Sequence, residues 1–192
     1  MRNRLRLDSS GASAAEFALV LPLLLLFLFG IIDAGRFLWE FNRAEKATQM
    51  GVRFAAVADM VPATLRAQNF ALSNGIPGGD PVPTSAFDDT VCDNSSCTNS
   101  WGYDDAAFDR IVGRMRLMYP PITESNVRVE YKNVGLGYAG DPNGPDVAPL
   151  VTVRLTNMTF RPVVGLLFGL SFPMPDFAAA MTLEDGTGIV SN

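Results

Sequence analysis

Residues 11–35 read GASAAEFALVLPLLLLFLFGIIDAG and decide how the rest of the chain is arranged. Within them, 17–32 is an unbroken apolar run of 16 residues, preceded by Glu16 and followed by Asp33. As a helix this run would cover ~24 Å at ~1.5 Å per residue, and the small residues 12–15 extend it toward the ~30 Å core of a bilayer. The sequence therefore predicts a transmembrane helix with Glu16 just inside the membrane, where an ionisable side chain is costly and indicates function.

The flanks of the apolar run predict its orientation. Arg2, Arg4 and Arg6 precede it, so the N-terminus is expected in the cytoplasm and the bulk of the chain outside. A cleaved secretory signal is one alternative, but its only candidate cleavage motif, Ile-Asp-Ala at 32–34, is poor. An uncut anchor is another alternative. We expect a single-pass protein of the inner membrane with a periplasmic C-terminal domain.

A third interpretation rests on the spacing of Gly11 and Glu16. Gly11 ends a basic leader of eleven residues, and Glu16 is the fifth residue after it. This pattern resembles the class III signal of type IV prepilins, which prepilin peptidase cuts on the cytoplasmic side after the glycine. The resemblance implies cleavage between Gly11 and Ala12.

The residues after the predicted cleavage point resemble the TadE-like pseudopilin family of the tight-adherence (Tad/Flp) pilus system. The resemblance lies in EFALVLP at 16–22, FGIID at 29–33 and GR at 35–36, with a weaker likeness over 150–184. Phe17 stands where the major pilin often has Tyr, which suits the TadE branch. The implied partners are a prepilin peptidase, other Tad minor pilins and pseudopilins, the major Flp pilin and an inner-membrane platform, besides the lipid bilayer.

Glu16 has a physical role to play in such an assembly. Cleavage would create an α-amine on Ala12, and Glu16 of one subunit would pair with the amine of a neighbour. Desolvation offsets most of that attraction, so the pair would set helix register more than affinity. A Glu16 without any role at the headgroup level is the alternative. Pro22 removes one helical hydrogen bond, and we expect a kink or local melting at 20–22.

Composition excludes several classes of function. The chain has 192 residues, a net charge of −5 and no histidine. A negative charge argues against nucleic-acid binding, and the lack of histidine excludes Ser-His-Asp catalysis and histidine-ligated metals. Cys92 and Cys97 lie in a polar stretch and are predicted to form a local disulfide in an oxidising periplasm. We expect no cofactor and no metal.

Two loop motifs suggest ligands without completing a site. The glycines at 135–140 match G-x-G-x-x-G, but DPNGP at 141–145 cannot begin the helix that a dinucleotide site requires. The acidic clusters at 88–93 and 141–146 imitate part of a calcium loop without its full ligand spacing. Both motifs are therefore interpreted as loops.

The apolar helix is expected to continue into the exported part of the chain, from 12 to 59. A stripe at helical period supports this, made of Phe37, Phe41, Ala44, Ala47, Gly51, Phe54, Ala55 and Ala58. Its small residues permit close packing, which we expect against the protein's own domain, with a neighbouring helix as the alternative.

The remaining chain predicts a small α+β domain. We expect a helix over 62–72, a long loop over 75–100 and a helix from an N-cap at Asp104 or Asp105 to Tyr119. Alternating patterns predict antiparallel strands at 127–132, 150–160 and 177–183. The apolar segment 163–172 is expected to cover the sheet, with the membrane surface as the alternative.

These elements give a long N-terminal helix packed on a sheet of about three strands, with additional short helices. The expected domains are a leader (1–11), a transmembrane helix with its extension (12–60) and a periplasmic domain (61–192). We expect a minor pilin or pseudopilin that primes or tips a Tad-type pilus without catalysis. The alternatives are a membrane-anchored periplasmic binding module that needs no cleavage and uses the 75–100 loop, and a membrane-tethered enzyme.

Overall fold

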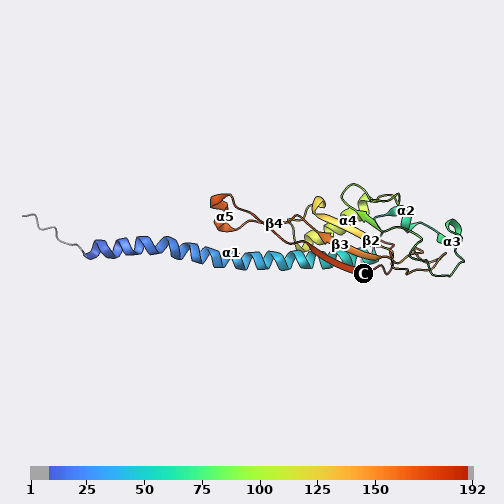
Figure 1. Cartoon of the computed structure of the whole chain (residues 1–192), viewed down its shortest axis with the longest axis horizontal. Coiled ribbons are helices and arrows are strands. Elements are labelled where there is room, and N and C mark those ends of the chain that lie inside the picture. The colour runs from blue at the N-terminus through green and yellow to red at the C-terminus, as the bar shows by residue number, and fades with distance from the viewer. Residues whose placement is uncertain (1–8, 190–192) are drawn as a thin grey trace, which may run out of the picture. The chain divides into compact units, whose positions relative to one another are not determined.

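The computed structural model describes residues 9–189 (Figure 1). The chain divides into two compact units. The first, here the N-terminal unit, holds the chain up to Trp39 together with Phe160–Phe172. The second, here the sheet unit, holds Glu40–Thr159 and the chain from Pro173 onward. The arginines and Asp8 of the predicted leader lie outside the described residues.

The helix α1 runs from Ser9 to Val57 without interruption, over 49 residues. This confirms the continuous helix expected from 12 to 59. Residues 20–22 stay helical around Pro22, so the backbone does not melt there, and a bend at this point stays a prediction.

A four-stranded antiparallel sheet forms the centre of the sheet unit, in the order β1-β2-β3-β6. The strands are β1 (Thr90–Cys92), β2 (Val127–Lys132), β3 (Leu150–Leu155) and β6 (Phe177–Thr182). The α+β class is confirmed, and the strand patterns at 127–132 and 177–183 are each a strand of this sheet. The fourth strand, β1, lies inside the stretch 75–100 that was expected to be a loop. Its three residues pair with β2 and are too few to show an alternating pattern among the polar residues around them.

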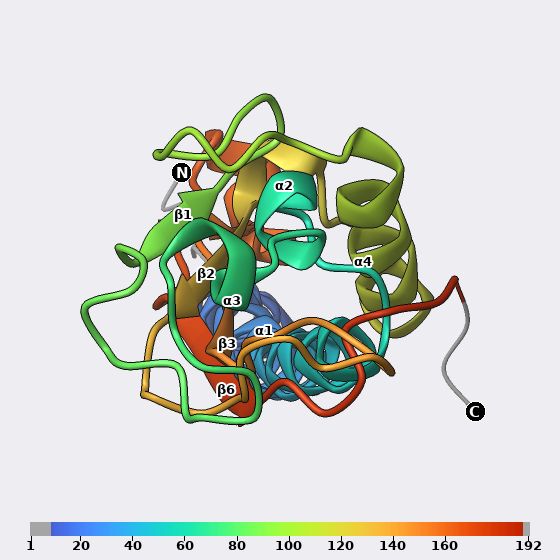
Figure 2. The same ribbon diagram turned by 90° about the vertical axis from the view of Figure 1, so that its right-hand side faces the viewer.

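The half of α1 in the sheet unit packs against both the sheet and α4 (Asp105–Met118). Ala44, Ala47, Ala55 and Ala56 are fully buried. A Cβ added at Gly51 would lie 2.8 Å from the Met115 Cγ in α4 and 3.3 Å from a Val153 methyl in β3. Figure 2 looks along α1, with β3 and β6 to one side of it and α4 to another. The expected packing of the small residues on the protein's own domain is therefore confirmed.

The helix expected over 62–72 is instead two short ones, α2 (Ala63–Arg66) and α3 (Phe70–Ser73). Asn69 between them has an extended backbone, and its side chain accepts the N–H of Leu72 at the start of α3. The asparagine caps a new helix, which is why one helix does not continue through it. The helix after Asp104 is confirmed, since the Asp104 side chain caps α4 by accepting the Ala107 N–H.

The strand expected over 150–160 ends at Leu155, and Asn157 follows in a left-handed conformation with φ of 58°. Beyond this turn come β4 (Thr159–Phe160), α5 (Val163–Phe168) and β5 (Phe172–Pro173), and β4 pairs with β5. The expectation that 163–172 covers the sheet is wrong, because α5 belongs to the N-terminal unit and not to the sheet unit. The backbone of α5 binds a carboxylate of α1 instead.

Candidate functional site

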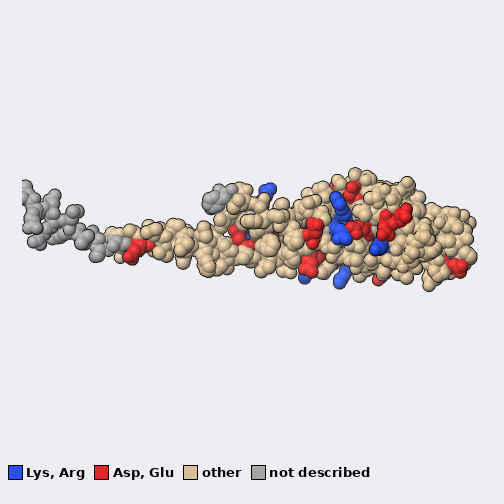
Figure 3. All heavy atoms as spheres, in the orientation of Figure 1, with Lys and Arg blue, Asp and Glu red and all other residues tan. Residues whose placement is uncertain are grey.

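The N-terminal half of α1 presents an apolar surface. Within Ser13–Val57 the helix contains a stretch that is long and apolar enough to cross a membrane, and its most apolar 18-residue window has no buried residue. Phe17, Leu19 and Leu23 are 65%, 79% and 70% exposed. Figure 3 shows Lys, Arg, Asp and Glu atoms gathered over the sheet unit, whereas most of the visible surface of this half of α1 carries none.

The predicted processing and register residues lie at the start of this helix. Gly11 and Ala12 are within α1, after its first residue Ser9, and Glu16 is exposed one turn further on. A Cβ added at Gly11 would meet no atom within 4 Å. The structure places Gly11 and Glu16 on one continuous helix, and both are exposed.

Asp33 directly follows the apolar run, and its role in the fold is what the sequence analysis missed. It is only 7% exposed. Its Oδ1 accepts the backbone N–H of Val163 at 2.7 Å, and its Oδ2 accepts that of Val164 at 3.1 Å. These are the first two N–H groups of α5, whose N-cap residue Pro162 offers no capping side chain. A carboxylate from α1 therefore caps a helix that follows 130 positions later.

Two further side chains of α1 hold the same segment. Arg36 lies one turn after Asp33 and donates to its Oδ1 at 3.3 Å. The Arg36 guanidinium also lies 5.5 Å from the centroid of the Phe160 ring. Phe37 meets Phe160 edge to face, with the ring centroids 5.4 Å apart. Asp33, Arg36 and Phe37 share a helix face, and together they attach the Phe160–Phe172 segment directly after the apolar run.

The predicted disulfide between Cys92 and Cys97 is present, with an S–S distance of 2.00 Å. Inside it, the Asp93 Oδ1 accepts the N–H groups of Ser95 and Ser96 at 2.9 and 3.0 Å. The Ser95 N–H holds the pKa of the Asp93 carboxyl below its usual value. The bridge closes a tight turn at the end of β1, which is a structural role.

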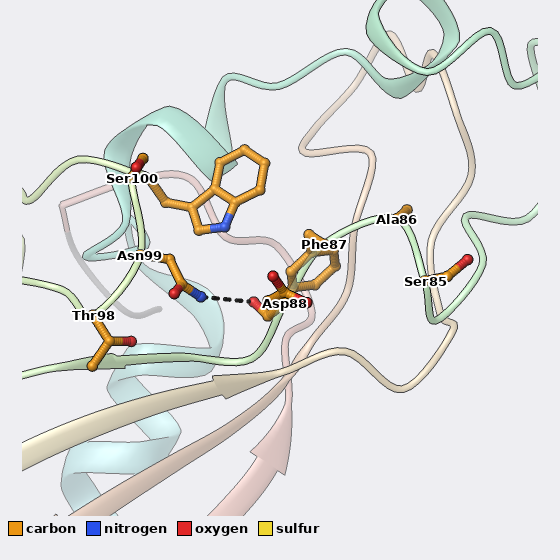
Figure 4. A pocket seen from close by; sticks show the side chains of 8 residues that line it. Ser85, Ala86, Phe87, Asp88, Thr98, Asn99 and Ser100 are labelled. Atoms are coloured by element: carbon orange, nitrogen blue, oxygen red, sulfur yellow. Dashed lines mark hydrogen bonds between the residues drawn. The ribbon is translucent and has the colours of Figure 1, made fainter.

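Beside this turn lies an open depression of about 430 Å³, lined by residues 85–88 and 98–101 (Figure 4). The Asn99 Nδ2 donates to the backbone carbonyl of Asp89 at 2.8 Å, so this amide holds the loop together. The Phe87 ring meets the Trp101 ring at 90°, with centroids 6.4 Å apart. The pocket combines an aromatic pair with exposed polar groups, among them Asp88.

The loop motifs set aside above are structural. Asp146 is buried, and its Oδ2 accepts the N–H groups of Phe70 and Gly140 at 2.6 and 2.8 Å. A Cβ at Gly137 would come within 2.3 Å of the Asp146 carbonyl oxygen, so this glycine permits a close backbone approach. Over residues 9–189 no three side chains of the metal-binding kind come together.

Comparison with known families identifies the N-terminal segment. Residues 11–53 match the family described as TadE-like protein. Neither the curated proteins nor the solved structures contain a significant match to the chain. The weaker resemblance over 150–184 lies outside the matched residues. The matched stretch contains Gly11, Glu16, the apolar run and Asp33, and of the small packing residues it contains Ala44, Ala47 and Gly51. Over residues 11–53, the chain is therefore similar to the TadE-like family.

Proposed function

We propose that this protein is a minor pilin or pseudopilin that primes or tips a Tad-type pilus, without catalysis. The N-terminal half of α1 spans the inner membrane with the N-terminus in the cytoplasm, and the sheet unit lies in the periplasm. The chain then consists of a leader (1–11), the membrane helix with its extension (12–60) and the periplasmic domain (61–192). Its partners are prepilin peptidase, sister minor pilins, the major Flp pilin and the inner-membrane platform.

The observation that carries this proposal is the different use of the two halves of α1. From residue 40 to residue 57 the small residues of α1 pack within the sheet unit, as the buried Ala44, Ala47 and Ala55 indicate. From residue 17 to residue 32 almost every side chain is exposed. A helix with one half buried in its own domain and an apolar half exposed can present that apolar half to lipid or to a bundle of similar helices.

The leader and Glu16 complete the proposal. Prepilin peptidase cuts after Gly11, and the new amine of Ala12 pairs with Glu16 of a neighbouring subunit. Gly11 lies within α1, and glycine lowers helix stability by ~1 kcal/mol relative to alanine, which favours the local opening that a protease requires. The exposed Glu16 is accessible to a second helix in the bundle.

The test is the N-terminal sequence and intact mass of the membrane-extracted protein, from cells with and without prepilin peptidase. A start at Ala12 that requires the peptidase supports the proposal, and a start at Met1 in both cells contradicts it. Gly11→Ala should block processing. Gly30→Ala is the matched control, because a Cβ at either glycine meets no atom within 4 Å.

The pocket beside the disulfide favours a second candidate, a membrane-anchored periplasmic binding module. In that case the leader stays on the protein, and function depends on the aromatic pair of Phe87 and Trp101. Trp101→Ala would then abolish function in a chain that is anchored and uncut. If cells that carry this variant still assemble pili and adhere through them normally, the binding-module hypothesis is excluded.

A further inference from the structure

The Phe160–Phe172 segment is fixed at one level along α1. Its attachment residues are Asp33, Arg36 and Phe37, which follow the last residue of the apolar run, Ile32. At ~1.5 Å per residue these contacts lie within ~8 Å of the end of the run along the helix axis. If the run spans the bilayer, as proposed above, the segment lies at the periplasmic boundary between acyl chains and headgroups.

The segment exposes apolar side chains at this level. Gly169 adopts a left-handed conformation that ends α5, and beyond it Leu170 and Phe172 are 52% and 53% exposed. The sequence of α5, VVGLLF, contains no polar residue. Exposed leucine and phenylalanine next to a membrane span are typical of segments that lie in the bilayer interface.

Basic side chains flank the same segment. Arg161 is exposed at its start, and the Arg36 side chain is 39% exposed while its guanidinium contacts Asp33. Arginine at this depth can reach the phosphates of lipid headgroups while its aliphatic stem stays among apolar groups. Apolar side chains and arginines on one short segment match the chemistry of the phospholipid interface.

We propose that the Phe160–Phe172 segment lies in the outer-leaflet interface of the inner membrane, with Leu170 and Phe172 among the acyl chains and Arg161 at the headgroup phosphates. The occupant of this apolar surface is lipid, because the surface continues the exposed apolar surface of the membrane helix. Asp33 holds α5 at this depth by capping its first turn. The segment thereby gives the periplasmic domain a second contact with the membrane beside the helix itself.

The experiment places an environment-sensitive fluorophore on single cysteines of the full chain in phosphatidylethanolamine–phosphatidylglycerol vesicles. Cys92 and Cys97 are bonded to each other, so an added cysteine is the one that reacts. Phe172→Cys is the reporter, and Leu170→Cys is a second reporter if the first variant does not fold. Leu72→Cys, at an 86% exposed position in the sheet unit, is the control. Nitroxide-labelled lipids then measure how much of each fluorescence is quenched by the membrane.

The expected result is a blue-shifted emission at 172 and quenching at least several-fold stronger than at 72, with shallow nitroxides most effective. Equal weak quenching at both positions overturns the proposal. A blue shift at 172 that disappears when the protein is diluted in lipid also overturns the proposal. A second copy of the chain, and not lipid, would then cover the apolar surface. Leu24→Cys separates this outcome from failure of the proposed span: deep quenching at 24 without quenching at 172 contradicts only the interfacial segment.

Discussion

The Asp33 carboxylate in α1 accepts the backbone N–H of Val163 in α5 at 2.7 Å, across 130 positions of sequence. It accepts the next N–H, that of Val164, with its other oxygen. An acidic residue directly after an apolar run is commonly interpreted only as the point where a membrane-spanning segment ends. Here the acid also organises a distant segment, since it supplies the cap of α5 that Pro162 cannot provide.

Asp33→Asn should release α5. The amide has one acceptor oxygen in place of two, and it carries no charge to interact with the helix N-terminus. Together these losses should lower the local free energy of opening α5 by about 1–2 kcal/mol. Backbone amides of residues 163–168 should then exchange with deuterium about tenfold faster in hydrogen-exchange mass spectrometry of the full chain. Asp80→Asn is the control, because Asp80 is an exposed loop acid. Unchanged exchange in the Asp33 variant would show that the aromatic contact of Phe37 and Phe160 suffices to hold the segment.

Gly51→Val should destabilise the sheet unit by about 1–3 kcal/mol, because its side chain must enter space already filled by Met115 and Val153. The flexible Met115 can relieve part of an added methyl group, which is why valine is a stronger test than alanine. Thermal unfolding in detergent measures the change. Gly30→Val, in an open position of the same helix, should leave the midpoint of the sheet unit within experimental error. Equal midpoints for both variants would mean that α1 is not packed here as described.

These two positions mark what the sequence can and cannot predict. Gly51 belongs to a local pattern of small residues at helical spacing, so its burial follows from the sequence once the period is recognised. Asp33 acts through a partner that is distant along the chain, and no local pattern indicates it. The strand β1 was missed for a similar reason, because its three residues are defined by pairing with β2 and not by their own alternation.

The roles of the predicted processing site and of Glu16 cannot be derived from one chain for a different reason. Their roles depend on a peptidase and on neighbouring subunits, so a single chain displays only their exposure and their spacing on α1. The disulfide was predictable because both cysteines lie on one short polar loop and need no distant partner.

Tyr119 provides a test by pH. Its hydroxyl donates to the Glu40 Oε2 at 3.2 Å, and burial together with the Glu40 charge raises its pKa to about 12. The protonated Tyr119 side chain contributes to the stability of the folded protein. Because its folded pKa is above the unfolded value of ~10, this contribution is complete below pH ~10 and is lost as the pH rises through about 12. Burial also raises the pKa of Tyr103 and Tyr131, so the tyrosinate absorbance near 295 nm should show one late-titrating group fewer in Tyr119→Phe than in the parent protein. Identical titration curves for the two proteins would contradict the buried contact with Glu40.

Glu16→Ala should separate processing from assembly. In the proposed function, prepilin peptidase recognises the leader and the bond after Gly11, so the variant is expected to be cut to a chain that begins at Ala12. In the proposed assembly, neighbouring helices without this carboxylate lose the pair with the Ala12 amine that fixes their register. The amount assembled into pili should then fall on the order of tenfold, which corresponds to ~1.4 kcal/mol. Cell-surface pili are counted by electron microscopy, and the processed chain is measured by intact mass.

Glu16→Gln and Glu16→Asp sharpen this test. Glutamine keeps the size and hydrogen-bonding capacity but not the charge, so it should resemble alanine if pairing with the α-amine sets the register. Aspartate keeps the charge on a side chain one methylene shorter, and it should restore part of the assembly. If the glutamine variant forms normal pili, the ion pair is not what aligns the helices. A charged side chain at this position of the proposed membrane helix would then need another explanation.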